Sequence, residues 1–457
     1  MQTSDQTLEL LPPAAVLKLS ELIGALSHAL DITEGQPAGH CVRCCWIGMH
    51  IGREIGLPDD QLWELYYTLL LKDLGCSSNA ARICELYLTD DLSFKRDFKS
   101  VGDSLPQVLS FVLKHTGLKA GLAERFRSVL TIMRDGERIA HDLIATRCQR
   151  GAEIARLLRF SSGVAAGIYS LDEHYNGEGR PDRLAGAAIP VYARIALLAQ
   201  VIDVFHTAGG QSAALAEVRL RDAHWFDPRL VQAFERVALA PAFWATLGSP
   251  EIDAAVRALE PPGHEVPLDE DYLDDIAAAF GQVVDSKSPY TSGHSARVAL
   301  YADMIAETLG LSAPRRRWLK RAALLHDVGK LGVSNSVLDK AGKLDDEEWA
   351  AVKLHATYTE TILSRIGALG ELARIAGAHH ERLDGGGYPR GLTAPAISYE
   401  TRIITTADIF DAITAERPYR GAIPIPRTLE MMAETVGSAI DASCFDALKR
   451  ALARLPG

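Results

Sequence analysis

The chain has 457 residues, of which 47% are hydrophobic and 23% charged, a composition typical of a folded soluble protein rather than a disordered one. Its net charge of -11 argues against binding to nucleic acid polymers, which need a basic face. Seven cysteines without disulfide spacing suit a reducing compartment, so we expect a cytoplasmic protein. Neither a bilayer-length apolar run nor a signal-like start stands out, and we expect no membrane partner.

Helical periodicity dominates the chain. Apolar residues recur at spacings of three and four, and alternating strand patterns are nearly absent, which predicts an all-α fold. The stretch 256–272 holds three prolines and an acidic run and lacks this periodicity. We therefore predict a helical domain over 1–255, a linker over 256–272 and a second helical domain over 273–457.

The two halves resemble each other. Residues 39–73 match residues 293–327 at an offset of 254, and residues 177–195 match residues 385–403 at an offset of 208. The difference of 46 residues is extra length in the first half, between Ser77 and about Arg147. Two matching blocks in the same order predict a duplication.

Metal-binding side chains lie on apolar helical stripes of the second half. Burying each of them without a partner would cost several kcal/mol, whereas convergence on cations removes that cost. We expect each to project from the buried face of a different helix. The seven candidates are His294, His326, Asp327, His355, His379, His380 and Asp408.

Five imidazoles and two carboxylates exceed what one tetrahedral zinc ion needs. They suit two octahedral-leaning divalent ions, with iron or manganese first and zinc, nickel or cobalt as alternatives. Two ions about 3.5–4 Å apart can activate water and stabilise the leaving oxygen of an in-line displacement at phosphorus. The alternative interpretation is a structural metal or a polar core.

Three strings carry a family resemblance. LLHDVGKLGVSNSVLDKAGKLDDEEW, HHERLDGGGYPRGL and ADIFDAITAERPYR lie within about 273–450 and resemble an HD-GYP domain, the cyclic-dinucleotide phosphodiesterase branch of the HD superfamily. The resemblance implies that Asp327 bridges two metal ions. It assigns His294, His326 and Asp408 to one ion, and His355, His379 and His380 to the other. A Glu that binds a third ion in some members is replaced by Tyr290, so we expect two ions.

The resemblance also implies residues that contact substrate. Lys330, one turn after His326, is expected against the scissile phosphate, where a cation offsets developing charge. The glycine-dense loop over 381–391 lets backbone amides approach a ligand closely, although a plain surface turn is the alternative. Further substrate-binding candidates are Gly387, Tyr388, Pro389, Arg417 and Arg420, and the alternative for each arginine is a solvated charge. Asp384 and Asp411 are expected to orient ligands or shape loops.

The first half keeps two of the seven ligand positions, His40 and Asp73. The other five positions hold Lys72, Arg147, Leu171, Asp172 and Gln200. Lysine and arginine would then supply the positive charge that the remaining carboxylates need. We predict a degenerate, metal-free HD-like bundle that shapes, dimerises or regulates the second half.

These observations predict a metal-dependent phosphodiesterase that hydrolyses a cyclic dinucleotide to a linear dinucleotide or mononucleotides. Cyclic di-GMP is the first choice of substrate and 3′,3′-cyclic GMP-AMP the alternative, because a degenerate copy before an intact one also resembles enzymes that act on cyclic GMP-AMP. A non-catalytic cyclic-dinucleotide-binding signalling module and a phosphohydrolase of nucleoside phosphates are the competing hypotheses. A homodimer and signalling protein partners are implied by the resemblance alone.

Overall fold

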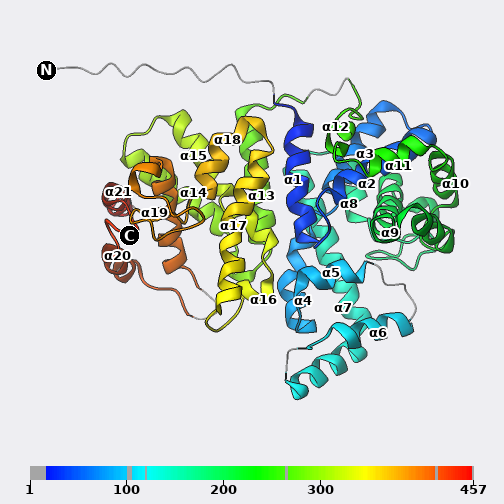
Figure 1. The fold of residues 1–457 in the computed structure, drawn as a ribbon, viewed down its shortest axis with the longest axis horizontal. Helices are drawn as coiled ribbons and strands as arrows, with labels where there is room; N and C mark the ends of the chain where they lie inside the picture. The colour runs from blue at the N-terminus through cyan, green and yellow to red at the C-terminus, as the bar shows by residue number, and fades with distance from the viewer. Residues whose placement is uncertain (1–16, 100–104, 119–120, 263–265, 417–419, 455–457) are drawn as a thin grey trace.

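The computed structural model describes residues 17–99, 105–118, 121–262, 266–416 and 420–454. These residues fold into helices joined by turns (Figure 1). Three isolated β-bridges form within these ranges, but no β-strand does. The prediction of an all-α protein is therefore confirmed.

The first half contains twelve α-helices in its described residues and the second half nine. The first-half helices are α1 (Leu19–Thr33), α2 (His40–Glu54), α3 (Asp59–Leu71), α4 (Ala80–Tyr87), α5 (Asp91–Phe98), α6 (Leu105–His115), α7 (Leu122–Leu157), α8 (Ser162–Tyr169), α9 (Val191–Leu220), α10 (Pro228–Val237), α11 (Pro241–Leu247) and α12 (Ile252–Arg257). The second-half helices are α13 (Glu270–Asp285), α14 (His294–Thr308), α15 (Ala313–Leu325), α16 (Asn335–Leu338), α17 (Asp346–Ser364), α18 (Gly370–Gly377), α19 (Tyr399–Thr414), α20 (Ile425–Ala433) and α21 (Ala442–Leu452). Short 3-10 turns are η1 (Cys76–Asn79), η2 (Gly186–Ala188), η3 (Pro289–Thr291), η4 (Val328–Gly332), η5 (Gly367–Leu369) and η6 (Ala394–Ala396).

Local sequence signals set the helix starts. A capping box between Asp345 and Glu348 begins α17, and the Ser398 hydroxyl accepts the amide of Thr401 at the start of α19. Gly293 precedes α14 with a φ of 68°, a conformation that favours glycine, and so the turn places His294 at the first position of the helix.

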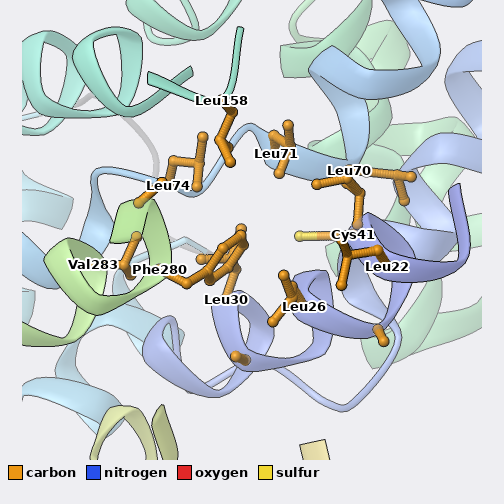
Figure 2. Close-up of a cluster of buried hydrophobic side chains, with 14 of the residues drawn as sticks. Leu22, Leu26, Leu30, Cys41, Leu70, Leu71, Leu74, Leu158, Phe280 and Val283 are labelled. Carbon is orange, nitrogen blue, oxygen red and sulfur yellow. The ribbon is translucent and has the colours of Figure 1, made fainter. Parts of the chain in front are cut away.

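The two halves share one continuous hydrophobic core. In Figure 1, α1 lies between the bulk of the first half and helices α13 and α17 of the second half. Figure 2 shows Phe280 and Val283 of α13 alongside Leu26 and Leu30 of α1 and Leu74, which follows α3. Phe280 is fully buried, so burial of apolar surface stabilises the contact between the halves.

The predicted linker is shorter and more tightly held than the sequence suggested. Helix α12 continues to Arg257 and α13 begins at Glu270 rather than near Leu273. Between them, the Glu260 carboxylate accepts hydrogen bonds from the hydroxyls of Ser20 and Tyr67, at 2.5 and 2.6 Å. Glu260 therefore anchors the described start of this stretch to the first half, which periodicity alone does not reveal.

Helix α9 is long and apolar enough to cross a membrane by those two criteria, contrary to the expectation from the sequence. However, 61% of its most apolar stretch is buried within the protein, as in the core helix of a soluble fold. Gly210, with a φ of 73° and a ψ of -170°, also interrupts the helix before its end.

We predict that Phe280→Ala lowers the unfolding free energy by about 3–5 kcal/mol, because it leaves a cavity between the two halves. Chemical denaturation followed by circular dichroism measures the change. The control is Leu300→Ala, which truncates a side chain that is 53% exposed on α14. An effect of Phe280→Ala no larger than that of the control would mean that α13 does not join the halves energetically.

Candidate functional site

All seven predicted metal-type side chains of the second half come together. His294 begins α14, His355 lies within α17, and Asp408 lies within α19. The other four follow helix ends, His326 and Asp327 after α15, and His379 and His380 after α18. The prediction that each candidate projects from the buried face of a different helix is therefore wrong for these four residues. The polypeptide leaves the helix at these points, and adjacent side chains of a turn can face the same cluster.

The Asp327 carboxylate lies at the centre of the cluster and is buried. Its Oδ2 atom lies 3.2 Å from His294 Nε2 and 3.1 Å from His326 Nε2. Its Oδ1 atom lies 3.4 Å from His355 Nε2 and 3.6 Å from His379 Nε2. The two oxygens therefore face two separate sets of imidazoles.

Asp408 and His380 complete these two sets. Asp408 Oδ1 lies 3.4 Å from His294 Nε2 and 3.8 Å from His326 Nε2. Ligand atoms of His355, His379, His380 and Asp327 lie within 4.8 Å of one another. Ligands about 2.1 Å from an ion stand about 3 Å apart, so both sets have the spacing of a coordination shell.

Three imidazoles are oriented by backbone carbonyls. The Nδ1 atoms of His326, His355 and His379 donate to the carbonyls of the residues three positions earlier, at 2.7, 2.5 and 2.6 Å. Because each Nδ1 carries the proton, each Nε2 presents its lone pair to the cluster. Metal-ligating histidines are commonly held in this way.

Hydroxyl groups fix the turns that carry these histidines. Thr359 donates to the carbonyl of His326 at 2.9 Å, and Thr405 donates to the carbonyl of His379 at 2.7 Å. Both threonines are buried, at 0% and 6% exposure. The helices behind the cluster therefore hold the backbone as well as the side chains.

The donor set fits metal ions on its own chemistry. His294 Nε2, His326 Nε2 and Asp327 Oδ1 are buried and have no hydrogen-bond partner. Leaving such atoms unsatisfied costs about 1–3 kcal/mol each or more, and a coordinated cation satisfies them together.

Electrostatics in the pocket favour a cation. Burial would lower the pKa of His294, but the carboxylates of Asp327, Asp408 and Asp411 outweigh it and raise the pKa to about 10. Burial, together with the charge of Lys330, outweighs the opposing charge of Asp327 and lowers the pKa of His355 to about 4. The pocket therefore combines imidazoles such as His355, which favour the neutral form, with imidazoles such as His294, whose charged form is favoured by carboxylates that require positive charge.

Two further predicted residues border the cluster. The Lys330 ammonium pairs with Asp327 Oδ2 and keeps 18% of its side chain exposed. Asp411 accepts a hydrogen bond from His294 Nδ1 at 2.7 Å and from Arg297 Nε at 2.6 Å. Asp411 thus orients His294, whereas the cation of Lys330 faces both the cluster and solvent.

The glycine-dense loop packs over the histidine pair. The Tyr388 ring lies 4.7 Å from the His380 ring, and the Tyr388 amide donates to the carbonyl of His380. A Cβ on Gly387 would overlap the backbone of His380 and Glu381, so this position needs glycine. Pro389 follows within the same turn.

Trp349 and Lys353 join this loop and were not recognised in the sequence. The Trp349 ring lies 6.1 Å from the Tyr388 ring and is 44% exposed, and Lys353 Nζ lies 5.9 Å from the centre of the Tyr388 ring. The available signal was an aromatic residue and a lysine on α17, six and two residues before His355. The distance of these two side chains from Tyr388 depends on the tertiary fold, which local sequence does not reveal.

The remaining predicted residues lie away from the cluster or outside the description. The Arg420 guanidinium donates to the carbonyls of Ala412 and Ile413 at the end of α19, which differs from the expected substrate contact. Asp384 accepts from Arg382 and the amide of Gly386, so it shapes the exposed loop. Arg417 lies outside the described residues.

In the first half, Lys72 occupies the position aligned with His326, one of the predicted metal ligands. Its ammonium pairs with Asp73 and lies 3.0 Å from both His40 Nε2 and Gln200 Oε1. Arg147 forms an ion pair with Asp172. Both pairings show that a lysine and an arginine supply positive charge to the carboxylates of Asp73 and Asp172.

Contacts around the cluster recur at aligned positions of the first half. His40 Nδ1 lies 2.6 Å from Asp203, which also pairs with Arg43, just as Asp411 joins His294 and Arg297. Loop contacts recur in the same way. Glu173 accepts the amides of Asp182 and Leu184, and Glu381 accepts the amides of Arg390 and Leu392.

Comparison with known proteins gives a consistent picture. The family model described as "HD domain" matches residues 127–230 and 279–444. A protein of Vibrio cholerae serotype O1, the 3′3′-cGAMP-specific phosphodiesterase 3, is 57% identical over 438 residues, which cover 96% of this chain and 95% of that protein. The crystal structure of the V. cholerae cyclic GMP-AMP-specific phosphodiesterase V-cGAP3 superposes with a TM-score of 0.66, at 51% identity, over 96% of this chain and 98% of that one.

Other relatives align with only part of the chain. The 3′3′-cGAMP-specific phosphodiesterase 1 of V. cholerae is 34% identical over 49% of this chain and 53% of that protein. The cyclic di-GMP phosphodiesterase response regulator RpfG of Xanthomonas campestris pv. campestris is 39% identical over 38% of this chain and 47% of that protein.

Glu34 of the first half provides a test of how its buried charges are held. Burial would raise the pKa of Glu34, but Lys99 and Lys95 lower it from 4.5 to about 2. A lowered carboxyl pKa stabilises the fold above the unfolded value and loses that contribution as pH falls toward the folded value. We expect the stability difference between wild type and Glu34→Gln to be constant above about pH 5.5. It should shrink by about 1 kcal/mol at pH 4 and by about 2 kcal/mol at pH 3.

Urea denaturation at each pH measures this difference. Glu124→Gln, near the start of α7, is the control and should show no comparable pH dependence. A stability difference that stays constant down to pH 3 would mean that Glu34 is not stabilised by the two lysines.

Proposed function

We propose, from the premise that this chain belongs to the HD domain family, that it is a metal-dependent HD-GYP phosphodiesterase acting on 3′,3′-cyclic GMP-AMP. The observation that carries the proposal is the buried Asp327 carboxylate, whose two oxygens face two sets of imidazoles. The relative that aligns over 96% of this chain carries a cyclic GMP-AMP name, and RpfG aligns over 38%. The alternative substrate is therefore favoured over cyclic di-GMP, the first choice from the sequence.

Two divalent ions, iron or manganese first, fit the donor set. One would be held by His294, His326 and Asp408, and the other by His355, His379 and His380, with Asp327 contributing one oxygen to each. Bound there, the ions supply Lewis acidity that activates water and stabilises charge on phosphate oxygens.

The side chains of the chain itself prepare the reaction. The carbonyl-bonded histidines keep their Nε2 lone pairs directed at the cluster, so little reorganisation accompanies binding. Lys330 presents a cation beside Asp327, where it would pair with a phosphate oxygen of the scissile diester. Burial of the cluster excludes bulk water and strengthens both interactions.

The loop above the histidine pair would hold the substrate. Tyr388 and Trp349 offer ring faces for a purine base, and Lys353 stands beside both rings. The surrounding backbone of Gly387 and Pro389 brings the Tyr388 ring over His380. Arg420 already bonds backbone carbonyls, so its contribution to substrate binding would require those bonds to break.

We infer that the first half, residues 1–255, is a degenerate copy of the second, residues 273–457. The recurrence of the His–Asp–Arg contacts and of the buried loop glutamates at aligned positions supports this inference. Lys72 and Arg147 beside the remaining carboxylates support a metal-free copy. The products are expected to be a linear dinucleotide and mononucleotides.

A cytoplasmic location and a homodimer belong to the same proposal. The seven cysteines are all unpaired thiols, which suits a reducing compartment. The relatives supply the link to second-messenger signalling, so signalling proteins are the expected partners.

We expect manganese- or iron-loaded protein, prepared without oxygen, to turn over 3′,3′-cyclic GMP-AMP at least tenfold faster than cyclic di-GMP. Chromatographic product analysis measures both rates. Asp327→Ala should lose activity by at least a thousandfold, because it removes the carboxylate shared by both sets of ligands. The matched control is Asp339→Ala, which lies outside the cluster. Equal or faster turnover of cyclic di-GMP would refute the substrate assignment.

Metal analysis tests the two-ion assignment separately from turnover. After loading with manganese and removal of free metal, wild type should retain about two ions per chain, and His355→Ala should retain about one. Asp73→Asn, in the first half, should leave the content unchanged. More than two ions per chain, with loss upon Asp73→Asn, would contradict a metal-free first half.

A further inference from the structure

The first half contains a cavity of about 260 Å³ that the proposed reaction does not use. It lies among α4, α5, α7 and α9. Several of its lining residues occupy positions aligned with the candidate catalytic site. These residues are Cys76, Arg147, Asp172, Arg180 and Gln200, aligned with Lys330, His355, His380, Tyr388 and Asp408. The cavity is thus the first-half counterpart of the site that holds the cluster.

Cations outnumber anions around this cavity. Four cationic and two anionic side chains line it, namely Lys95, Lys99, Arg147, Arg180, Glu34 and Asp172. Lys95 bonds the carbonyls of Thr33 and Cys76, and Arg147 pairs with Asp172. Their charges are therefore largely held within the protein.

Arg180 differs from Lys95 and Arg147, and among the described residues Lys99 is held by its ion pair with Glu34 alone. Arg180 Nε is buried without a hydrogen-bond partner, and its guanidinium forms no ion pair with the described residues. Lys99 Nζ lies 2.9 Å from Glu34 Oε2 but also lacks a partner in hydrogen-bonding geometry. Donors of this kind, facing a cavity, are suited to an anion.

Aromatic rings line the cavity on two sides. On one side, the Tyr87 and Phe94 rings lie 4.2 Å apart, and Phe98 of α5 lies nearby with 47% exposure. On the other side, the His174 ring stacks on the Trp225 ring at 4.2 Å. Flat apolar faces next to arginine and lysine match the two parts of a nucleotide, its base and its phosphate.

We propose that this cavity is a nucleotide-binding effector site, in which Arg180 and Lys99 hold a phosphate and the aromatic rings hold a purine base. Its volume suits one nucleoside monophosphate unit. Such a unit comes either from a mononucleotide product or from one half of the cyclic dinucleotide. The metal-type positions of the first half would thus have been converted from hydrolysis to metal-free recognition.

Helix α5 connects the cavity to the second half. Phe94, Lys95 and Phe98 of α5 line the cavity, and the helix begins at Asp91. The buried Asp91 carboxylate accepts the Asn335 amide at 2.8 Å and the Ser334 hydroxyl at 3.1 Å. An occupant that shifts α5 therefore acts on the segment directly after the turn that carries Lys330.

A second contact reinforces this connection. Lys287 Nζ, which is 1% exposed, lies 3.4 Å from Asp91 Oδ2. Gly332, which ends the turn carrying Lys330, packs so closely on Ile32 of α1 that an added Cβ would lie 3.0 Å from it. Lys287 in turn accepts a hydrogen bond from Asn335 through its carbonyl, and Gly332 lies in the turn of Lys330, so the coupling has a contiguous structural basis.

Binding is tested with the full chain in EDTA, where the absence of turnover keeps the result independent of the proposed function. The probes for calorimetry are GMP, AMP, 3′,3′-cyclic GMP-AMP and inorganic phosphate. We expect saturable binding of a nucleotide at one site that Arg180→Gln weakens at least tenfold and Arg138→Gln leaves unchanged. Arg138 is an exposed arginine on α7 and serves as the matched control.

The probes distinguish the two sources of ligand. A tighter mononucleotide identifies the product, and a tighter cyclic dinucleotide identifies the substrate. Phosphate binding as tight as that of every nucleotide would overturn recognition of a base. Unchanged affinity and stoichiometry in Arg180→Gln would overturn the site. If Arg180→Gln does not fold, Phe98→Ala, at an exposed ring, tests the same cavity and is held to the same outcomes.

An activity measurement tests the effector role and rests on the proposed function. Addition of the bound nucleotide should change the turnover of cyclic GMP-AMP at least twofold in wild type and Arg138→Gln. Arg180→Gln should keep the rate measured without effector and lose the change. The same response in Arg180→Gln and wild type would refute regulation through this cavity, whatever the absolute rate.

Discussion

The buried carboxylate of Asp327 is the interaction on which the second half depends. A carboxylate removed from water needs positive charge on both oxygens, and this chain surrounds it with imidazole nitrogens and one ammonium group. Three helices and two turns carry these groups, and hydrogen bonds to the histidines point them inward. Thr359 and Thr405, which contact no metal-type atom, belong to this arrangement because they hold the turn carbonyls in place.

The same constraint explains the first half. Asp73 is the aligned carboxylate, and the pocket around it satisfies the charge with Lys72 instead. Burial opposes a charged lysine, but the neighbouring Asp73 outweighs it and raises the pKa of Lys72, so the two groups stay charged together. On the proposed assignment, one architecture accommodates either ions or fixed cations, and the choice depends on a few side chains.

Sequence reasoning located the seven cluster residues because their order and helical spacing are local properties. It placed the linker end three residues late at α13 and treated four turn residues as helical, since helix ends depend on tertiary contacts. The carbonyl bonds of Arg420 and the approach of Trp349 to Tyr388 were not predicted. Both depend on how distant segments meet, which neither periodicity nor motif order encodes.

The packing of α13 against the first half limits how the chain can change during evolution. Loss of the first half would expose the Phe280 face of α13 and remove the Asp91 carboxylate that pairs with the Lys287 ammonium. The stability of the second half therefore opposes deletion of the first half, independently of any chemistry in the first-half interior. On the proposal that the first half is a degenerate copy, this packing keeps it in the chain while its interior diverges.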